Sequence, residues 1–151
     1  LSELGRFQAE QVAERLKNEK IEVIITTDLA RAKQTAEKIA EKNKHFTKNP
    51  ILENGFREIT NGIMDGKHIS AFAKELDAKK LDRYNFKYEG GESIKDVHIR
   101  VKRSLKKILE EHKGKTITIF KSNQNIIVRI ICICSQSNIL ICSLNYHMTS
   151  N

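Results

Sequence analysis

Short β-branched runs that alternate with helical patterns constrain the fold of this chain more than any other feature. Residues 21–26 are Ile-Glu-Val-Ile-Ile-Thr and residues 116–120 are Thr-Ile-Thr-Ile-Phe, which predicts two buried strands. Apolar residues recur at helical spacing within residues 9–16, 29–40 and 94–109, which predicts a helix in each range. Because strands separated by helices usually pair in parallel, the sequence predicts an α/β fold with a largely parallel sheet flanked by helices.

Polar residues at the edges of these patterns predict how the helices begin. Ser2 is expected to cap the first helix, and Thr27 or Asp28 the second, because their side-chain oxygens can accept from the N–H groups of a first turn. Ser93 with Asp96 resembles a capping box at the start of the third helix.

Two segments follow the predicted strands directly, and parallel sheets collect ligands beyond the carboxyl ends of their strands. These segments are residues 27–31 and the polar residues 121–125, where we expect the chemistry of the chain. The pattern between the second and third helices is weaker, with a short extended piece predicted at residues 51–52 and a short helix at 69–76. The apolar residues 126–134 predict the opening of a last helix.

Size and charge limit the classes of partner. The 151 residues have the size of one domain, and 27 Lys and Arg against 19 Asp and Glu leave a net charge of +8, which favours anionic partners. Aromatic residues make up 6% of the chain and Trp is absent, which disfavours nucleic acid because little is left to stack on bases. Residues 130–151 carry no Asp, Glu, Lys or Arg, but polar residues 135–138 interrupt them, so no bilayer-spanning segment and no membrane partner is expected.

The cysteines predict a reducing compartment. Cys132, Cys134 and Cys142 are odd in number, which fits the cytoplasm better than a disulfide framework. Together with His147 they match no common zinc spacing, so buried thiols are the preferred interpretation. We therefore expect neither a metal nor a cofactor.

Arg31 is the strongest single candidate for a phosphate ligand. It falls in the first turn of the second predicted helix, where backbone N–H groups and the helix dipole favour an anion. It lies about 130° from the centre of that helix's apolar stripe, and a guanidinium there offers a planar fork to phosphate oxygens. The alternative is a surface arginine paired with Asp28 or Glu37.

Residues 26–36 read Thr-Thr-Asp-Leu-Ala-Arg-Ala-Lys-Gln-Thr-Ala, and this run closely resembles a signature of the histidine phosphatase superfamily, which has the phosphoglycerate mutase-like fold. Further stretches agree with the family in the same order and extend the resemblance over about residues 1–132. They are Leu-Ser-Glu-Leu-Gly at 1–5, Phe-Arg-Glu-Ile at 56–59 with Gly62 and Asp-Gly-Lys at 65–67, Gly-Gly-Glu-Ser at 90–93 followed by Arg100, and the strand at 116–120.

The resemblance implies phosphoryl transfer through a phosphohistidine. In the family, a histidine in an Arg-His-Gly tripeptide attacks phosphorus, while two arginines and a second histidine hold the phosphoryl oxygens. Arg31 matches an arginine that holds phosphate, and Glu58 matches the carboxyl that protonates the leaving oxygen. For Glu58, an ion pair with Arg57 or with a neighbouring lysine is the alternative.

The chain departs from the family at both histidines. None of its five histidines follows an arginine or precedes a glycine, so the nucleophile motif is absent from these residues. The second histidine is replaced by Asn123 or Gln124, depending on how the loop is aligned, and either amide could still bind a phosphate oxygen. We therefore expect a chain that does not turn over phosphate esters by itself, since Lys121 could compensate for the lost histidine in charge but not in position.

The expected architecture is a single, incomplete histidine-phosphatase-like domain over residues 1–151 that lacks the first strand of the sheet. Residues 130–151, with no charged side chain, are expected to be a tail that differs from the family's native C-terminus. The expected partner is a small phosphorylated metabolite. Two other hypotheses stay open: a non-catalytic binding module for phosphorylated ligands or nucleic acid, and a fold completed by a separately encoded N-terminal piece.

Overall fold

A computed structural model describes residues 1–67, 80–82, 84–121, 129–133 and 139–140, the last two ranges by their backbone alone. The chain divides into two compact units, which are described separately. The first consists of residues 1–58 and 106–151, and the second of residues 59–105. Within the described ranges, no helix combines the length and the apolar composition needed to cross a membrane.

The first unit is built on a sheet with the strand order β2-β1-β3-β4-β5. Its centre is parallel: β1 (Val23–Thr26) pairs with β2 (Ile51–Leu52) on one side and with β3 (Ile117–Lys121) on the other. All four residues of β1 are buried, as the β-branched sequence predicts. The α/β class and the parallel centre of the sheet are thereby confirmed.

One predicted helix is wrong. Within residues 126–134, the described part is the strand β4 (Arg129–Ile133), which pairs antiparallel with β3 and with β5 (Ile139–Leu140). The run Arg-Ile-Ile-Cys-Ile is rich in β-branched residues, which pack well on a pleated surface, and the edge of β3 supplies hydrogen-bonding partners for it. Pairing with β3 therefore makes residues 129–133 a strand, although their apolar pattern predicted a helix.

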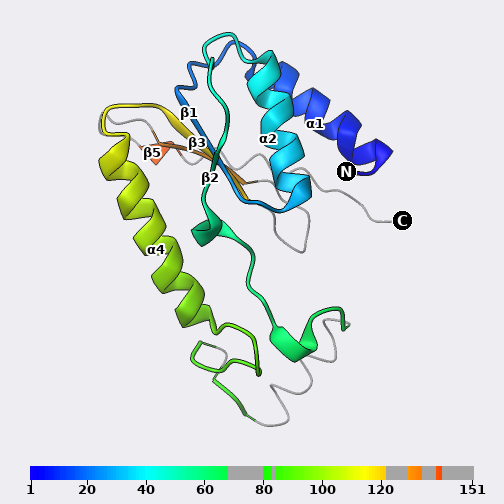
Figure 1. Ribbon diagram of the computed structural model, residues 1–151, viewed down its shortest axis with the longest axis vertical. Coiled ribbons are helices and arrows are strands. Elements are labelled where there is room, and N and C mark those ends of the chain that lie inside the picture. Colours follow the sequence, from blue (N-terminus) through cyan, green and yellow to red (C-terminus); the bar gives the residue numbers. More distant parts are fainter. Residues whose placement is uncertain (68–79, 83, 122–128, 134–138, 141–151) are drawn as a thin grey trace. The chain divides into compact units, whose positions relative to one another are not determined.

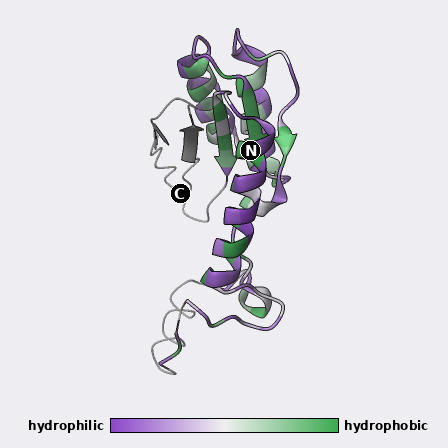
Figure 2. Ribbon diagram, turned by 90° about the vertical axis from the view of Figure 1, so that its left-hand side faces the viewer, coloured by the Kyte–Doolittle hydropathy of each residue, from purple (hydrophilic) through white to green (hydrophobic). Residues whose placement is uncertain are grey.

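Two helices cover one face of this sheet, α1 (Glu3–Leu16) and α2 (Ala30–Lys42) (Figure 1). Their apolar stripes pack on Ile24 of β1 and Phe120 of β3, both fully buried. In Figure 2 the central strands are coloured mainly as hydrophobic, whereas much of each helix is coloured as hydrophilic. The core cluster consists of Val12, Ala13, Leu16, Ile21, Ile24, Ala36, Ile39, Phe46 and Phe120.

The helix starts agree with the sequence in two cases out of three. Ser2 caps α1 by accepting from the N–H of Gly5 at 3.1 Å. Ser93 and Asp96 form the reciprocal capping box at the start of α4 (Ile94–Glu111), with bonds of 3.0 and 3.1 Å. The prediction for α2 is wrong: its N-cap is Leu29, which makes no side-chain capping hydrogen bond.

The second unit is held together where two glycine-containing turns meet. Gly62 and Gly90 both have positive φ, +57° and +69°. The N–H of Ile63 donates to the carbonyl of Glu89 at 3.1 Å, and the N–H of Glu92 donates to that of Thr60 at 2.8 Å. Two segments that resemble separate family motifs therefore lie against each other in this unit.

Helix α4 belongs to the second unit up to residue 105 and to the first unit from Lys106 onward. In the first unit it buries Ile108, which is 2% exposed, and Lys107 Nζ lies 3.4 Å from Glu53 Oε2, just after β2. Gly114, with φ +87°, follows the helix, and glycine is common just after the end of a helix because it adopts this conformation without strain. The predicted helix at 69–76, residues 122–125 of the polar loop, and residues 134–138 and 141–151 of the tail lie outside the described residues.

Candidate functional site

The candidate site lies where β1 ends and α2 begins. Thr26 pairs with Phe120 in register, so β1 and β3 both leave the sheet at the same edge, with Thr27 following one strand and Lys121 ending the other. A parallel sheet presents ligand-binding groups at this edge. Thr26 and Thr27 are fully buried, which fixes the chain as it turns into α2.

Arg31 reaches across to Glu58 at this edge. Its guanidinium nitrogen NH2 donates to Glu58 Oε2 at 3.0 Å, although the two residues are 27 positions apart. The side chain of Arg31 is 53% exposed and that of Glu58 is 11% exposed. An accessible guanidinium thus lies directly against a largely buried carboxylate, and both belong to the first unit.

A second ion pair joins the same two parts of the chain, the residues around the start of α2 and the residues around Glu58. Asp28, which precedes α2, accepts two hydrogen bonds from Arg57: Nε donates to Oδ1 at 2.5 Å, and NH2 donates to Oδ2. This hydrogen bonding lowers the pKa of Asp28 below its ordinary value and raises the pKa of Arg57 above its ordinary value. The sequence offered nearby partners, Asp28 or Glu37 for Arg31 and Arg57 or a neighbouring lysine for Glu58. The structure instead joins Arg31 to Glu58 and Asp28 to Arg57.

The remaining predicted ligands of the site are Asn123 and Gln124, and both lie outside the described residues. Their role in binding phosphate stays a prediction. The Asp28–Arg57 pair is the feature that sequence reasoning missed. Its signal was present, because Asp28 lies in the predicted site segment 27–31 and Arg57 adjoins the candidate residue Glu58, but spacing along the chain does not reveal a partner 29 residues away.

A second ionic cluster holds the other unit together. Arg100 of α4 donates to both carboxylate oxygens of Glu92, from Nε to Oε1 at 2.6 Å and from NH2 to Oε2 at 2.9 Å. Glu92 Oε2 also accepts from the N–H of Thr60 at 3.3 Å. The hydrogen bonds from Arg100 hold the pKa of Glu92 below its ordinary value, so this carboxylate is charged at neutral pH.

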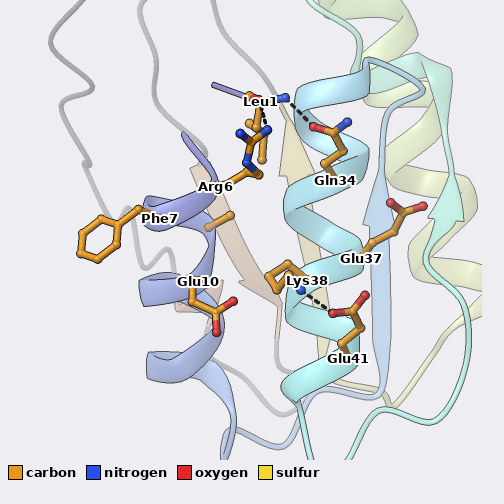
Figure 3. A pocket seen from close by; sticks show the side chains of 9 residues that line it. Leu1, Arg6, Phe7, Glu10, Gln34, Glu37, Lys38 and Glu41 are labelled. Carbon is orange, nitrogen blue, oxygen red and sulfur yellow. Dashed lines mark hydrogen bonds and ion pairs between the residues drawn. The ribbon is translucent and has the colours of Figure 1, made fainter. Parts of the chain in front are cut away.

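The first unit also has an open pocket between α1 and α2 (Figure 3). Acidic and basic side chains alternate on its walls, and Lys38 is itself paired with Glu41 at 2.6 Å. Neither Arg31 nor Glu58 lines it, so this pocket is separate from the candidate site. Its lining is Leu1, Arg6, Phe7, Ala9, Glu10, Gln34, Glu37, Lys38 and Glu41.

No group of three His, Cys, Asp or Glu side chains that could hold a metal ion occurs in the part of the chain that the structure describes. Of the residues weighed as a zinc site, Cys132 is described only as backbone of β4, and Cys134, Cys142 and His147 lie outside the described ranges. Buried thiols therefore stay a prediction.

Sequence comparison finds a match to the Histidine phosphatase superfamily (branch 1) over residues 1–138. A probable phosphoglycerate mutase GpmB of Photorhabdus laumondii is 36% identical over 109 residues, which are 70% of this chain and 49% of that protein. Phosphoserine phosphatase 1 of Hydrogenobacter thermophilus is 31% identical over 124 residues, 79% of this chain and 57% of that protein. The chain thus spans about half the length of these curated relatives.

Solved structures show the same similarity in three dimensions. A mycobacterial glucosyl-3-phosphoglycerate phosphatase in complex with inorganic phosphate matches with a TM-score of 0.60 and 28% identity, over 73% of this chain and 53% of that one. YhfR of Bacillus stearothermophilus matches with a TM-score of 0.64 over 81% of this chain and 60% of that one, and at 24% identity it supports the fold alone.

Proposed function

Because the chain belongs to the histidine phosphatase superfamily, we propose that Arg31 binds the phosphoryl group of a small phosphorylated metabolite and that Glu58 is the proton donor of the lineage's reaction. The contact of 3.0 Å between Arg31 and Glu58 is the observation that carries this proposal. It brings together two residues that the family signature assigns to one site and that lie far apart in the sequence.

The chemistry fits the two side chains. An exposed guanidinium can exchange a carboxylate partner for phosphate oxygens, which it holds with two parallel N–H donors. A phosphate dianion at Arg31 favours the neutral acid form of a neighbouring carboxyl, and a neutral carboxylic acid can protonate a leaving oxygen. Asn123 or Gln124 would add an amide donor to the phosphate oxygens in this proposal.

We further propose that these 151 residues bind phosphate esters without turning them over. In-line attack on phosphorus needs a positioned nucleophile, and none of the five histidines stands in an Arg-His-Gly sequence. In this proposal both units belong to one domain, which the continuous family match over residues 1–138 supports. The odd number of cysteines supports a reducing compartment, and hence the cytoplasm, as the place where it acts.

The test combines binding and turnover. Isothermal titration with inorganic phosphate should detect binding to the unaltered chain and its loss in Arg31→Ala. Lys33→Ala is the matched control, because it removes the same charge two residues further along α2. Lys33 Nζ lies 3.8 Å from Glu37 Oε1. Hydrolysis of 4-nitrophenyl phosphate should stay at background for all three proteins.

Two results would contradict these proposals. Equal losses of phosphate binding in Arg31→Ala and Lys33→Ala would mean that the net positive charge, rather than Arg31, attracts the anion. Steady hydrolysis by the unaltered chain that disappears in Arg31→Ala would disprove the claim that the chain does not turn over phosphate esters.

A non-catalytic module that binds nucleic acid is the second candidate function, and it is favoured only by the net charge of +8. Many basic side chains in the described ranges are engaged with carboxylates, among them Arg15, Lys42 and Lys87, which reduces the field that a phosphate backbone would meet. A steep loss of DNA binding with rising salt, indicating several phosphate contacts, would favour this candidate.

A further inference from the structure

The start of α2 is unusual because an aspartate stands beside it and does not cap it. Aspartate is among the best N-terminal capping residues, since its carboxylate accepts from N–H groups of the first turn. Asp28 lies directly before the N-cap residue Leu29, which makes no side-chain capping hydrogen bond. Both carboxylate oxygens of Asp28 are bound by Arg57 instead.

A released Asp28 would compete with an incoming anion. It lies three residues before Arg31, a separation over which side chains at a helix start reach one another. The ordinary pKa of an aspartate carboxyl, 3.8, lies well below neutral pH, so Asp28 stays a carboxylate even after its hydrogen bonds from Arg57 are lost. A carboxylate that turned toward the first turn of α2 would occupy the donors and the positive charge that a phosphoryl group requires.

We propose that Arg57 is a positioning residue for the Arg31 site: it holds the Asp28 carboxylate away from the start of α2 and thereby keeps Arg31 open to a phosphoryl group. This inference rests on the proposed function of Arg31. It gives a physical reason for the way the two ion pairs are arranged. The arginine near the start of α2, Arg31, binds Glu58, and the arginine next to Glu58, Arg57, binds Asp28.

Arg57 could also act only as a scaffold, because it precedes Glu58 and ties that segment to the end of β1. The two roles differ in what happens when Asp28 is neutralised. If Arg57 sequesters a competing carboxylate, neutralising Asp28 restores the site after Arg57 is removed. If Arg57 is only a scaffold, removing Asp28 as well restores nothing.

The experiment is a double-mutant cycle with inorganic phosphate as the probe, measured by titration calorimetry at neutral pH and constant ionic strength. Arg57→Ala should weaken binding by about fivefold, the scale of one partly exposed ion pair. Asp28→Asn should bind at least as tightly as the unaltered chain, and the double variant should regain that affinity. Arg57→Lys should recover part of the loss, because lysine keeps the charge without the fork.

Two outcomes overturn the inference: an Arg57→Ala variant that binds phosphate as tightly as the unaltered chain, or a double variant as weak as Arg57→Ala. Circular dichroism of each variant shows whether the fold is retained. A second readout needs no phosphate, namely the NMR signal of the Arg31 side-chain Nε–H. It should shift in Arg57→Ala and return in the double variant, and an unchanged signal in Arg57→Ala also overturns the inference.

These readouts separate the two proposals. If the unaltered chain binds no phosphate, the proposed function of Arg31 fails, and the Arg31 NMR signal still decides whether Arg57 keeps Asp28 away from it. If phosphate binds in an Arg31-dependent way but Asp28→Asn gives no rescue, the proposed function stands and the role of Arg57 is refuted.

Discussion

Replacement of Gly62 by alanine should destabilise the second unit far more than replacement of Gly66, although both glycines have positive φ, +57° and +82°. A Cβ on Gly62 would lie 2.0 Å from the carbonyl oxygen of Glu89 and 2.5 Å from the nitrogen of Gly91. A Cβ on Gly66 would meet nothing within 4 Å. Comparison of the two variants therefore separates two contributions to the loss of stability: the steric clash at a close backbone approach, and the strain of a left-handed residue that carries a Cβ.

The magnitude follows from the contacts. A left-handed residue with a Cβ costs about 1–2 kcal/mol, and Gly66→Ala recovers part of this through a less flexible unfolded chain. In Gly62→Ala, the Glu89 carbonyl would also have to retreat by about 1.4 Å to reach an ordinary contact distance. That movement would break its hydrogen bond from the N–H of Ile63, now 3.1 Å, which adds about 1 kcal/mol or more.

Amide hydrogen exchange measures this loss of stability at individual residues of the second unit. We expect the exchange of the Ile63 and Glu92 amides, which bond across the two turns, to accelerate by about 30-fold to 150-fold in Gly62→Ala. In Gly66→Ala the acceleration should be about fivefold. Equal acceleration in the two variants would refute the reasoning, because it would mean that the close approach at Gly62 does not limit the stability of this unit.

Two further predictions concern the core and the pH dependence. Ile24 is fully buried and packs with Phe120, so Ile24→Ala should lower the free energy of unfolding, measured by urea denaturation, by about 2–5 kcal/mol. Ile51 on β2 is 43% exposed, so Ile51→Ala should change this free energy little. Similar losses at both positions would contradict the assignment of the core. Because Arg100 depresses the pKa of Glu92 in the folded state, the stabilisation by this pair is complete above the ordinary carboxyl pKa of 4.5 and is lost as pH falls through the lower folded value. Glu92→Gln should therefore weaken the acid-induced loss of stability of the second unit, followed by amide exchange from pH 6 to pH 3, and an unchanged pH profile would argue against the pair.

Much of the fold could be predicted because it depends on short-range patterns. The β-branched run before Thr27 predicts β1, the spacing of apolar residues predicts α1, α2 and α4, and Ser2 and Ser93 predict two helix starts. Each of these features is decided by neighbours within about one helical turn or one strand, so they can be read from the sequence. The family signature likewise places Arg31 after β1, because that motif is a continuous run of residues.

What the sequence by itself determined is thus the α/β class, the helix and strand content of most described residues, and the identity of the two charged groups assigned to the site. Only the tertiary structure decided which charges meet, since Arg31 and Glu58 are 27 residues apart and Asp28 and Arg57 are 29 apart. It also decided that Leu29, rather than Asp28, is the N-cap of α2 and that residues 129–133 form a strand. The physical reason is the same in each case: folding brings up a partner from a distant part of the chain, Arg57 for the Asp28 carboxylate and β3 for residues 129–133.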